Sequence, residues 1–426
     1  MQFTKPVRLA LRSLPVVLAS ILVLHRIVAG GPTQASEHPG CSWPTTPAAD
    51  VPYRTDFGTP QNAACAVSDV PFDFGRLDSP PAATIDSGID VVAHWYQGFG
   101  NETSLASSDW NGWYDWRWNK PDNTGDGVAA PGWDPSRAPL IGNYRGDDPD
   151  VLGWIAYWLA SGGVDAVSFP NAAGFSSSWS KDGTWSHAYF EETPNAKALG
   201  YVLPLANKGG AAEISRRAQE LVAFVAAHPW AHTEAVDGGR YAVVNVWDLE
   251  ALRGNFDNYQ GSAKSTAFLR DLADRFRSIG YDGVTVLARN GGVIAANADS
   301  LRDDHVNVYF SSYDGKYAGA TTNDGYDAYV DSLDTTTAFG RQNTVPGVFT
   351  SLETVKPHPS SYAVAGASPE SFRRLLRKTV SAIDQQGLPR MITVYNVSEW
   401  AEGGPGLIPN AQDGFGYLEA LRTTVG

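Results

Sequence analysis

The chain has 426 residues and a net charge of −14 at pH 7, with 18% charged and 43% hydrophobic residues. This acidic balance argues against binding to nucleic acid or to anionic membranes, because few cations are present to neutralise phosphates. The hydrophobic fraction excludes a mainly disordered chain, and the length suits one large α/β barrel or two ordinary domains. Two cysteines, 14 tryptophans and 43 glycines are typical of a loop-rich extracellular protein.

The first 35 residues have the layout of a secretory signal peptide. Lys5, Arg8 and Arg12 precede an apolar run over 14–24, and small residues follow as far as Ala35. That run is shorter than the roughly 20 residues that cross a bilayer, so the sequence predicts a cleaved signal over 1–35, with an uncleaved anchor as the alternative. We therefore expect a secreted protein that makes no membrane contact once it is processed.

A proline-rich segment over 36–85 follows the signal and contains both cysteines. In an oxidising compartment, Cys41 and Cys65 are expected to form a disulfide that closes a loop of about 25 residues and stabilises the protein by about 3 kcal/mol. We predict an N-terminal strap over 36–85 rather than a domain, followed by one domain over 86–426.

Eight short apolar runs recur in chain order over this last part. They are residues 90–95, 164–169, 200–205, 241–247, 283–288, 306–310, 347–352 and 391–395. Such near-continuous apolar runs are typical of parallel strands buried on both faces. Helices are predicted over 148–160, 211–227, 263–279, 369–386 and 413–421, the fourth from the start signal Ser368-Pro369-Glu370.

A strand followed by a helix, repeated eight times, predicts an α/β fold, namely a (β/α)8 TIM barrel. A doubly wound open sheet is the alternative, although the GxGxxG turn that often follows its first strand is absent. In a barrel the active site is built at the C-terminal ends of the strands, so the residues at those ends are the candidates for function.

Carboxylates, aromatic rings and amides dominate the predicted strand ends. We expect the following to bind the substrate: His94, Tyr96, Asn171, Lys208, Asp248, Tyr313, Glu353 and Trp400. No histidine trio, HExxH, GxSxG or Walker loop is present, so the sequence predicts neither a metal nor another cofactor.

The loop after the first strand is rich in tryptophan. Trp110, Trp113 and Trp116 lie within nine residues, with amides and carboxylates between them. Pyranose rings have apolar faces and hydroxyl edges, so this mixture predicts the wall of a sugar-binding cleft. A loop that packs its tryptophans against its own backbone is the alternative.

Two glutamates follow the last predicted strand. Glu399 and Glu402 are three residues apart, and repulsion between neighbouring carboxyls raises one pKa. One protonated and one ionised carboxyl is the pair that glycosidic cleavage requires, whereas a solvated acidic turn is the plain alternative. Asp248 and Glu353, at the ends of the fourth and seventh strands, are a second possible pair. The residues directly before Asp248 are Val246 and Trp247, whereas Asn is usual before an acid/base at this place.

The segment Ser398-Glu399-Trp400-Ala401-Glu402-Gly403, with Leu407-Ile408-Pro409 and Gly416-Tyr417-Leu418 after it, resembles the ending of the family 99 glycoside hydrolases and their family 71 relatives. The segment 139–144 and Tyr96 resemble other points of the same family. The resemblance implies a retaining endo-α-mannosidase-type mechanism. In it, Glu399 assists the attack of the sugar 2-hydroxyl on C1, and Glu402 protonates the leaving oxygen and later activates water.

One departure from the family leaves the substrate open. Ser398 stands where the family has Asn, so a sugar other than mannan is possible. The sequence predicts a secreted glycoside hydrolase that cleaves α-glycosidic bonds in an α-mannan-like or α-glucan-like polysaccharide or oligosaccharide. A catalytically inactive, lectin-like barrel and another hydrolase or transferase acting on sugars are the alternatives.

Overall fold

The computed structural model describes residues 87–95, 149–169, 189–190, 193, 196–205, 209–246, 248–288, 294, 298–311, 325–340, 343–350, 352–353, 363–364, 366–398, 406–410 and 412–425. The chain divides into two compact units, Met1–Ala35 and Ser36–Gly426, and the described residues all belong to the second. The predicted signal peptide, the strap and the disulfide between Cys41 and Cys65 lie outside the described residues and stay predictions.

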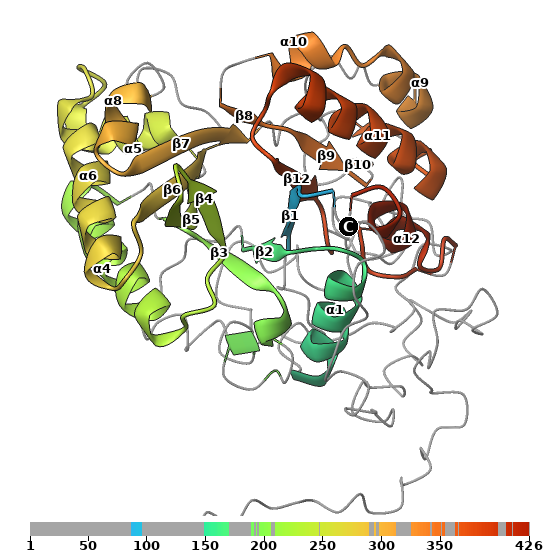
Figure 1. Cartoon of the computed structure of the whole chain (residues 1–426), viewed down its shortest axis with the longest axis horizontal. Helices are drawn as coiled ribbons and strands as arrows, with labels where there is room; N and C mark the ends of the chain where they lie inside the picture. The colour runs from blue at the N-terminus through green and yellow to red at the C-terminus, as the bar shows by residue number, and fades with distance from the viewer. Residues whose placement is uncertain are drawn as a thin grey trace, which may run out of the picture. The chain divides into compact units, whose positions relative to one another are not determined.

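Eight strand positions form a parallel sheet that is nearly closed into a barrel (Figure 1). They are β1 Asp90–His94, β2 Ala166–Ser168, β3 Gly200–Pro204, β5 Gly239–Val246, β6 Gly283–Ala288, β7 Val306–Ser311, the divided position β8 Thr344–Val345 with β9 Gly347–Phe349, and β12 Met391–Tyr395. Strand positions follow one another around the sheet in chain order, and the last, β12, pairs in parallel with the first, β1. This pairing rules out the doubly wound sheet, in which the two edges stay apart. The prediction of an α/β barrel is confirmed to this extent.

The seventh strand position completes the ring by changing its neighbour at Pro346. Before the proline, Val345 of β8 pairs with Ser311 of β7; after it, Val348 of β9 pairs with Val394 of β12. The Pro346 carbonyl accepts a hydrogen bond from the Thr393 N–H at 2.9 Å. Proline has no N–H to donate, so it suits the point where the segment leaves one partner strand for the next.

Apolar side chains cover both faces of the barrel strands. One cluster takes its members from the strands alone and fills the barrel interior: Val92, Ala166, Val202, Val243, Leu287, Val345 and Met391, with Tyr309 packed against them. A larger cluster joins the outward-facing strand residues to the helices. Burial on both faces is the reason that the strands have near-continuous apolar sequences.

Helices cover the outside of the barrel. Those that the sequence predicts are α1 Pro149–Ser161, α4 Ala211–Ala227, α6 Ala263–Ser278, α11 Pro369–Gln386 and α12 Gly416–Arg422. The bounds of α4 and α11 agree with the prediction to the residue, and α12 begins three residues later than predicted. Short helices that were not predicted are α5 Leu249–Asp257, α8 Ala298–Asp303, α9 Gly325–Ser332 and α10 Thr335–Phe339. No helix in the described ranges is long and apolar enough to cross a membrane.

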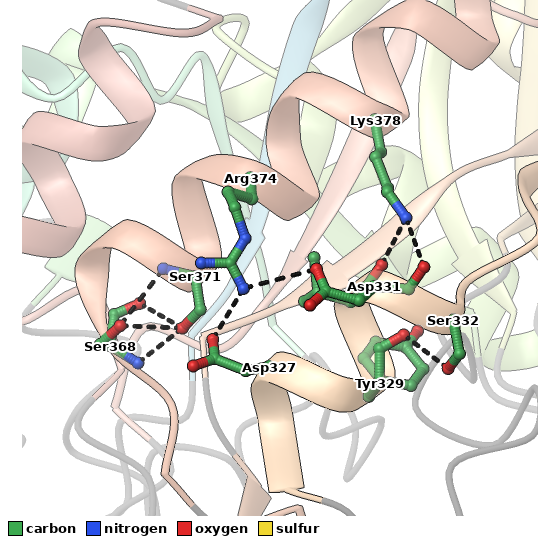
Figure 2. Close-up of polar contacts among 9 residues, drawn as sticks. Asp327, Tyr329, Asp331, Ser332, Ser368, Ser371, Arg374 and Lys378 are labelled. Carbon is green, nitrogen blue, oxygen red and sulfur yellow. Dashed lines mark hydrogen bonds and ion pairs between the residues drawn. The ribbon is translucent and has the colours of Figure 1, made fainter.

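Helix α11 shows how local sequence determines a helix start. The Ser371 N–H donates to the Ser368 hydroxyl at 3.2 Å, and the Ser368 N–H donates to the Ser371 hydroxyl at 2.9 Å (Figure 2). This reciprocal cap satisfies two backbone groups that have no partner inside the helix, and Pro369 occupies the first turn. The start signal read from Ser368-Pro369-Glu370 is therefore confirmed.

Three short strands depart from the eightfold pattern. β4 Thr233–Val236 pairs antiparallel with the beginning of β5 across Asp237 and Gly238, whose φ angles are +51° and +83°. Asp-Gly is a strong signal for such a hairpin, but the strand before it is only four residues long. β10 Leu352–Glu353 and β11 Ala363–Val364 form a separate antiparallel pair, so the strand predicted over 347–352 ends at Phe349.

Candidate active site

A layer of small polar side chains lies above the apolar barrel interior, in the C-terminal half of alternate strand positions. Its members come two residues after Ala166, Val243, Tyr309 and Met391 of the interior cluster, and they are Ser168, Asn245, Ser311 and Thr393. Residues two apart on a strand face the same side, so this polar layer faces the inside of the barrel. All four side chains are buried.

Two hydrogen bonds link the members of the polar layer in pairs. Asn245 Nδ2 on β5 donates to Ser168 Oγ on β2 at 3.3 Å. On the other side of the barrel, Ser311 Oγ on β7 and Thr393 Oγ1 on β12 are 3.0 Å apart. Each bond passes over one intervening strand position, as expected where alternate strands contribute to one layer of a barrel. The layer closes the apolar interior with neutral hydroxyl and amide groups on the face where barrel enzymes have their active sites.

Sequence reasoning missed this polar layer because it considered the residues that follow each strand. Apart from His94, polar residues at inward-facing positions within or directly at the end of a strand were not considered. A signal was present in the sequence, since each of these polar residues stands two positions after an apolar interior residue. Reading every second residue to the end of each strand would have identified Ser168, Asn245, Ser311 and Thr393.

His94 is a predicted site residue that the structure brings to this end of the barrel. It ends β1, two residues after the interior Val92, and is 4% exposed. It pairs in register with Ser168 of the polar layer. Its carbonyl accepts a hydrogen bond from the Val397 N–H at 2.7 Å, which extends the contact between β1 and β12 beyond the end of β12.

The segments on either side of residues 399–405 pair with each other at this end of the barrel. The Leu407 N–H donates to the Asn396 carbonyl at 2.9 Å, and the Ile408 N–H donates to the Val397 carbonyl at 3.2 Å. Asn396, Ser398, Leu407 and Ile408 are all buried. The chain therefore leaves the end of β12 at Ser398 and returns beside it at Gly406.

Asp248, a second predicted site residue, caps a helix. Its Oδ1 accepts hydrogen bonds from the backbone N–H groups of Glu250 at 2.9 Å and Ala251 at 3.1 Å, at the start of α5. These bonds satisfy two of the unpaired donors of the first turn. A cap accounts for an aspartate immediately before α5. Glu353, which was considered as its catalytic partner, lies in β10 opposite Ala363, outside the barrel sheet.

The remaining predicted site residues lie outside the described residues. They are Glu399, Glu402, Tyr96, Trp110, Trp113, Trp116, Asn171, Lys208, Tyr313 and Trp400. Their roles stay predictions, and so does the prediction that the reaction needs no metal or other cofactor. Within the described ranges, no three His, Cys, Asp or Glu side chains converge in a way that could hold a metal ion.

A half-buried carboxyl lies toward the opposite, N-terminal end of the barrel. Glu234 of β4 accepts hydrogen bonds from Thr285 Oγ1 at 3.0 Å, from Asn307 Nδ2 at 3.2 Å and from the Tyr309 hydroxyl. Burial raises the pKa of Glu234, and the charge of Asp90 raises it further, while these hydrogen bonds lower it in part. Residues at this end of a barrel serve stability rather than catalysis, so Glu234 is not a candidate for the site.

The fold and the polar C-terminal end define a barrel of the kind that many enzymes use. No family model and no curated protein matches the sequence. Among solved structures, the chain is similar to two structures of the GH99 endo-α-mannosidase from Bacteroides thetaiotaomicron. Their TM-scores are 0.48 and 0.47 and their identities 13% and 15%; each covers 80% of this chain, and 96% and 97% of the mannosidase. A broad-specificity GH5 endoglucanase from Clostridium longisporum has a TM-score of 0.36 and 12% identity, covering 68% of this chain and 91% of the endoglucanase.

Proposed function

We propose that the protein is a secreted glycoside hydrolase that cleaves α-glycosidic bonds in an α-mannan-like or α-glucan-like polysaccharide or glycan. Glu399 and Glu402 are the catalytic carboxyls of this proposal, and His94 with the polar layer lines the site beneath the sugar. The proposal rests on the motif around the two glutamates and on the position of the residues on either side of that motif, at the C-terminal end of the barrel.

The pairing of residues 396–397 with 407–408 is the observation that carries the proposal. It holds both ends of the segment 399–405 beside His94 and close to the polar layer. Neighbouring Cα atoms are about 3.8 Å apart, so a single peptide unit connects Glu399 to the buried Ser398. The two glutamates thus belong to a short connection that starts and ends at the C-terminal end of the barrel, where barrel enzymes have their active sites.

The mechanism follows from the chemistry of two neighbouring carboxyls. With an α-mannoside, whose 2-hydroxyl is trans to the leaving oxygen, Glu399, ionised, accepts the proton of the 2-hydroxyl as that oxygen attacks C1 and forms a 1,2-anhydro sugar. Glu402, protonated, donates its proton to the oxygen of the departing sugar. Once ionised, Glu402 takes a proton from water as the water oxygen attacks C1 and opens the anhydro ring. Glu399 returns its proton to O2, so both carboxyls regain their starting states and the configuration at C1 is retained overall. Mutual repulsion between the carboxyls favours the required state, with one proton on the pair.

The release of reducing ends from a panel of polymers tests this function. The wild-type protein and Glu402→Gln are incubated with α-mannans, α-glucans and polymers that contain arabinose or galactose. We expect release from one polymer by the wild-type protein. The variant should lose about 100-fold or more of this rate, because the general acid and then the general base is removed, and each is worth about 100- to 10,000-fold.

Binding measurements beside this assay distinguish the alternatives. Calorimetric titration of each polymer into Glu402→Gln should still show binding, which separates loss of catalysis from loss of fold. Binding by the wild-type protein without any release would favour the lectin-like barrel. Equal rates for the wild-type protein and Glu402→Gln would remove Glu402 from the mechanism.

A further inference from the structure

The Tyr259 side chain is unusual because it is a large apolar group that stands in solvent. It is 60% exposed, and the described part of the chain has no other large hydrophobic side chain classed as exposed. Single apolar residues at a surface are common, and Tyr259 differs from them in how its ring is held.

The backbone around Tyr259 adopts a conformation that side chains disfavour. Asn258 and Tyr259 have φ angles of +49° and +60°, two successive residues in the left-handed region. This region costs roughly 1–2 kcal/mol for a residue with a Cβ, and an aromatic residue there is an outlier. Such outliers persist where the surrounding contacts enforce them and are often found at functional sites.

A glycine inside α5 makes room for the ring. A Cβ at Gly254 would overlap the phenol end of Tyr259, so the ring lies directly against the backbone of the helix. Glycine in the interior of a helix costs about 1 kcal/mol relative to alanine. The Asn258 N–H donates to the Gly254 carbonyl at 3.1 Å and closes the helix end beneath the ring.

Arg253 lies over one face of the Tyr259 ring, which leaves the opposite face for a ligand. Its Cζ lies 5.5 Å from the ring centroid, and its Nε donates to Glu250 Oε2 at 2.8 Å. The Arg253 side chain is only 12% exposed, so the guanidinium is largely covered. Its charge is paired with Glu250, and the neighbours of Tyr259 in the sequence are the exposed amide residues Asn258 and Gln260.

The Tyr259 ring lies at the same end of the barrel as the candidate active site. α6 runs from Ala263 toward Gly283 at the start of β6, so its own start, and the connection 258–262 before it, lies at the C-terminal end of the strands. α5 begins immediately after Asp248 at the end of β5, and Gly210 N–H, between β3 and α4, donates to Asn255 Oδ1 at 3.0 Å. With a rise of about 1.5 Å per residue, α5 separates Tyr259 from Asp248 by about 13 Å.

We propose that Tyr259 is a remote sugar-binding platform, on which a neutral pyranose of a long substrate stacks while another part of the chain occupies the active site. The apolar face of a pyranose matches a rigid aromatic face, and the neighbouring amides match its hydroxyls. A ring that is already fixed loses little conformational entropy on binding. This inference rests on the proposed function for its ligand class, but a binding measurement tests it without catalysis.

Affinity electrophoresis through gels containing α-mannan or α-glucan measures the platform directly. Tyr259→Ala should bind the retarding polymer about three- to tenfold more weakly than the wild-type protein, the range expected for one stacking contact. Tyr259→Phe should bind as the wild-type protein does, because the ring is kept. Gly254→Ala should also weaken binding, although alanine favours the helix, because its Cβ displaces the ring.

Each outcome bears on the platform separately from the active site. The proposal is overturned if Tyr259→Ala binds the polymer as tightly as the wild-type protein does. It is also overturned if neither polymer retards the wild-type protein. A loss of hydrolysis of a trisaccharide by Tyr259→Ala also overturns it, since a remote platform should affect long substrates only. Retardation that depends on Tyr259 in a protein without hydrolytic activity would support the platform and reject the proposed reaction.

Discussion

At Gly406 the backbone has a φ of +37°, and a Cβ there would overlap the carbonyl group of Val397. The residue stands where the chain returns from the glutamate segment and begins to pair with Asn396 and Val397. Glycine is required at this position for two separate reasons, the left-handed backbone and the close approach of another segment. Replacing Gly406 is therefore a way to shift the base of the segment without touching a carboxyl.

Gly406→Ala should lower kcat by about 10- to 100-fold, because a displacement of about 1 Å of a catalytic group can cost about 100-fold in rate. The kcat on the polymer that the wild-type protein cleaves is the measurement. Gly414→Ala is the matched control, since Gly414 has a φ of +57° but no atom within 4 Å of an added Cβ. Equal losses of kcat in the two variants would attribute the effect to backbone strain alone and contradict a positioning role for Gly406.

Helices α9 and α11, on the outside of the barrel, are joined by two polar contacts of unequal strength (Figure 2). Arg374 Nη2 lies 2.8 Å from Asp327 Oδ1, but the side chains are 37% and 65% exposed. Lys378 Nζ donates to the carbonyls of Val330 at 2.6 Å and Asp331 at 3.0 Å, at the C-terminal end of α9. Those carbonyls have no partner within the helix, and a cation there also interacts favourably with the helix dipole.

Lys378→Met should therefore lower the free energy of unfolding by about 1.5–3 kcal/mol, the usual range for hydrogen bonds to a charged group. Arg374→Met should lower it by less than about 1 kcal/mol, because exposed ion pairs contribute little. Methionine keeps much of the aliphatic stem in both variants. Urea unfolding at low and at 0.5 M salt measures the difference, and a larger effect for Arg374→Met at both salt concentrations would contradict this ranking.

The elements that the sequence predicted are those with a long or doubly buried pattern. α4 and α11 each extend over more than four turns with apolar residues on one face, and most barrel strands are apolar on both faces, so their positions were clear. The seventh strand position is the exception, because its two-residue first part, β8, lies before the predicted start at residue 347. The short helix α5 has only Leu249 and Leu252 buried, which is too few residues to reveal a period. β4 was missed because Glu234, a charged residue, occupies its inward-facing position.

The candidate site was predictable only where it depends on position in the barrel. The position of His94 at this end follows from its place at the end of an apolar strand, whereas Glu399 and Glu402 come from their motif alone and stay predictions. The binding of substrate by Asp248 stays a prediction, and the hydrogen bonds from Glu250 and Ala251 add a capping role that only the start of α5 reveals. Tyr259 carries no motif, and its relevance comes from the left-handed backbone and from Gly254, which are properties of the folded chain.

For the whole barrel, the two ends have different chemistry. The polar layer at the C-terminal end is neutral, whereas Glu234 brings a carboxyl into the interior toward the N-terminal end and connects β4 to β6 and β7. His232, two residues before it in the sequence, has its Nε2 3.4 Å from Asp90 Oδ2. The pKa of Glu234 is raised mainly by burial, so the folded protein binds its proton more tightly than the unfolded chain does.

The contribution of Glu234 to the free energy of unfolding should therefore fall as the pH rises. A raised pKa contributes stability below the ordinary value of 4.5, and this contribution is lost as the pH rises through the folded-state pKa. Relative to the wild-type protein, Glu234→Gln should gain stability between pH 5 and 8 by about 1.4 kcal/mol for each unit by which the pKa is raised. Urea unfolding across this range measures the slope.

Glu213→Gln is the control and should give a constant difference over the same range, because hydrogen bonds from Arg216 and Arg217 lower the pKa of Glu213 to about 2. A constant difference for Glu234→Gln as well would show that its carboxyl has an ordinary pKa in the folded barrel.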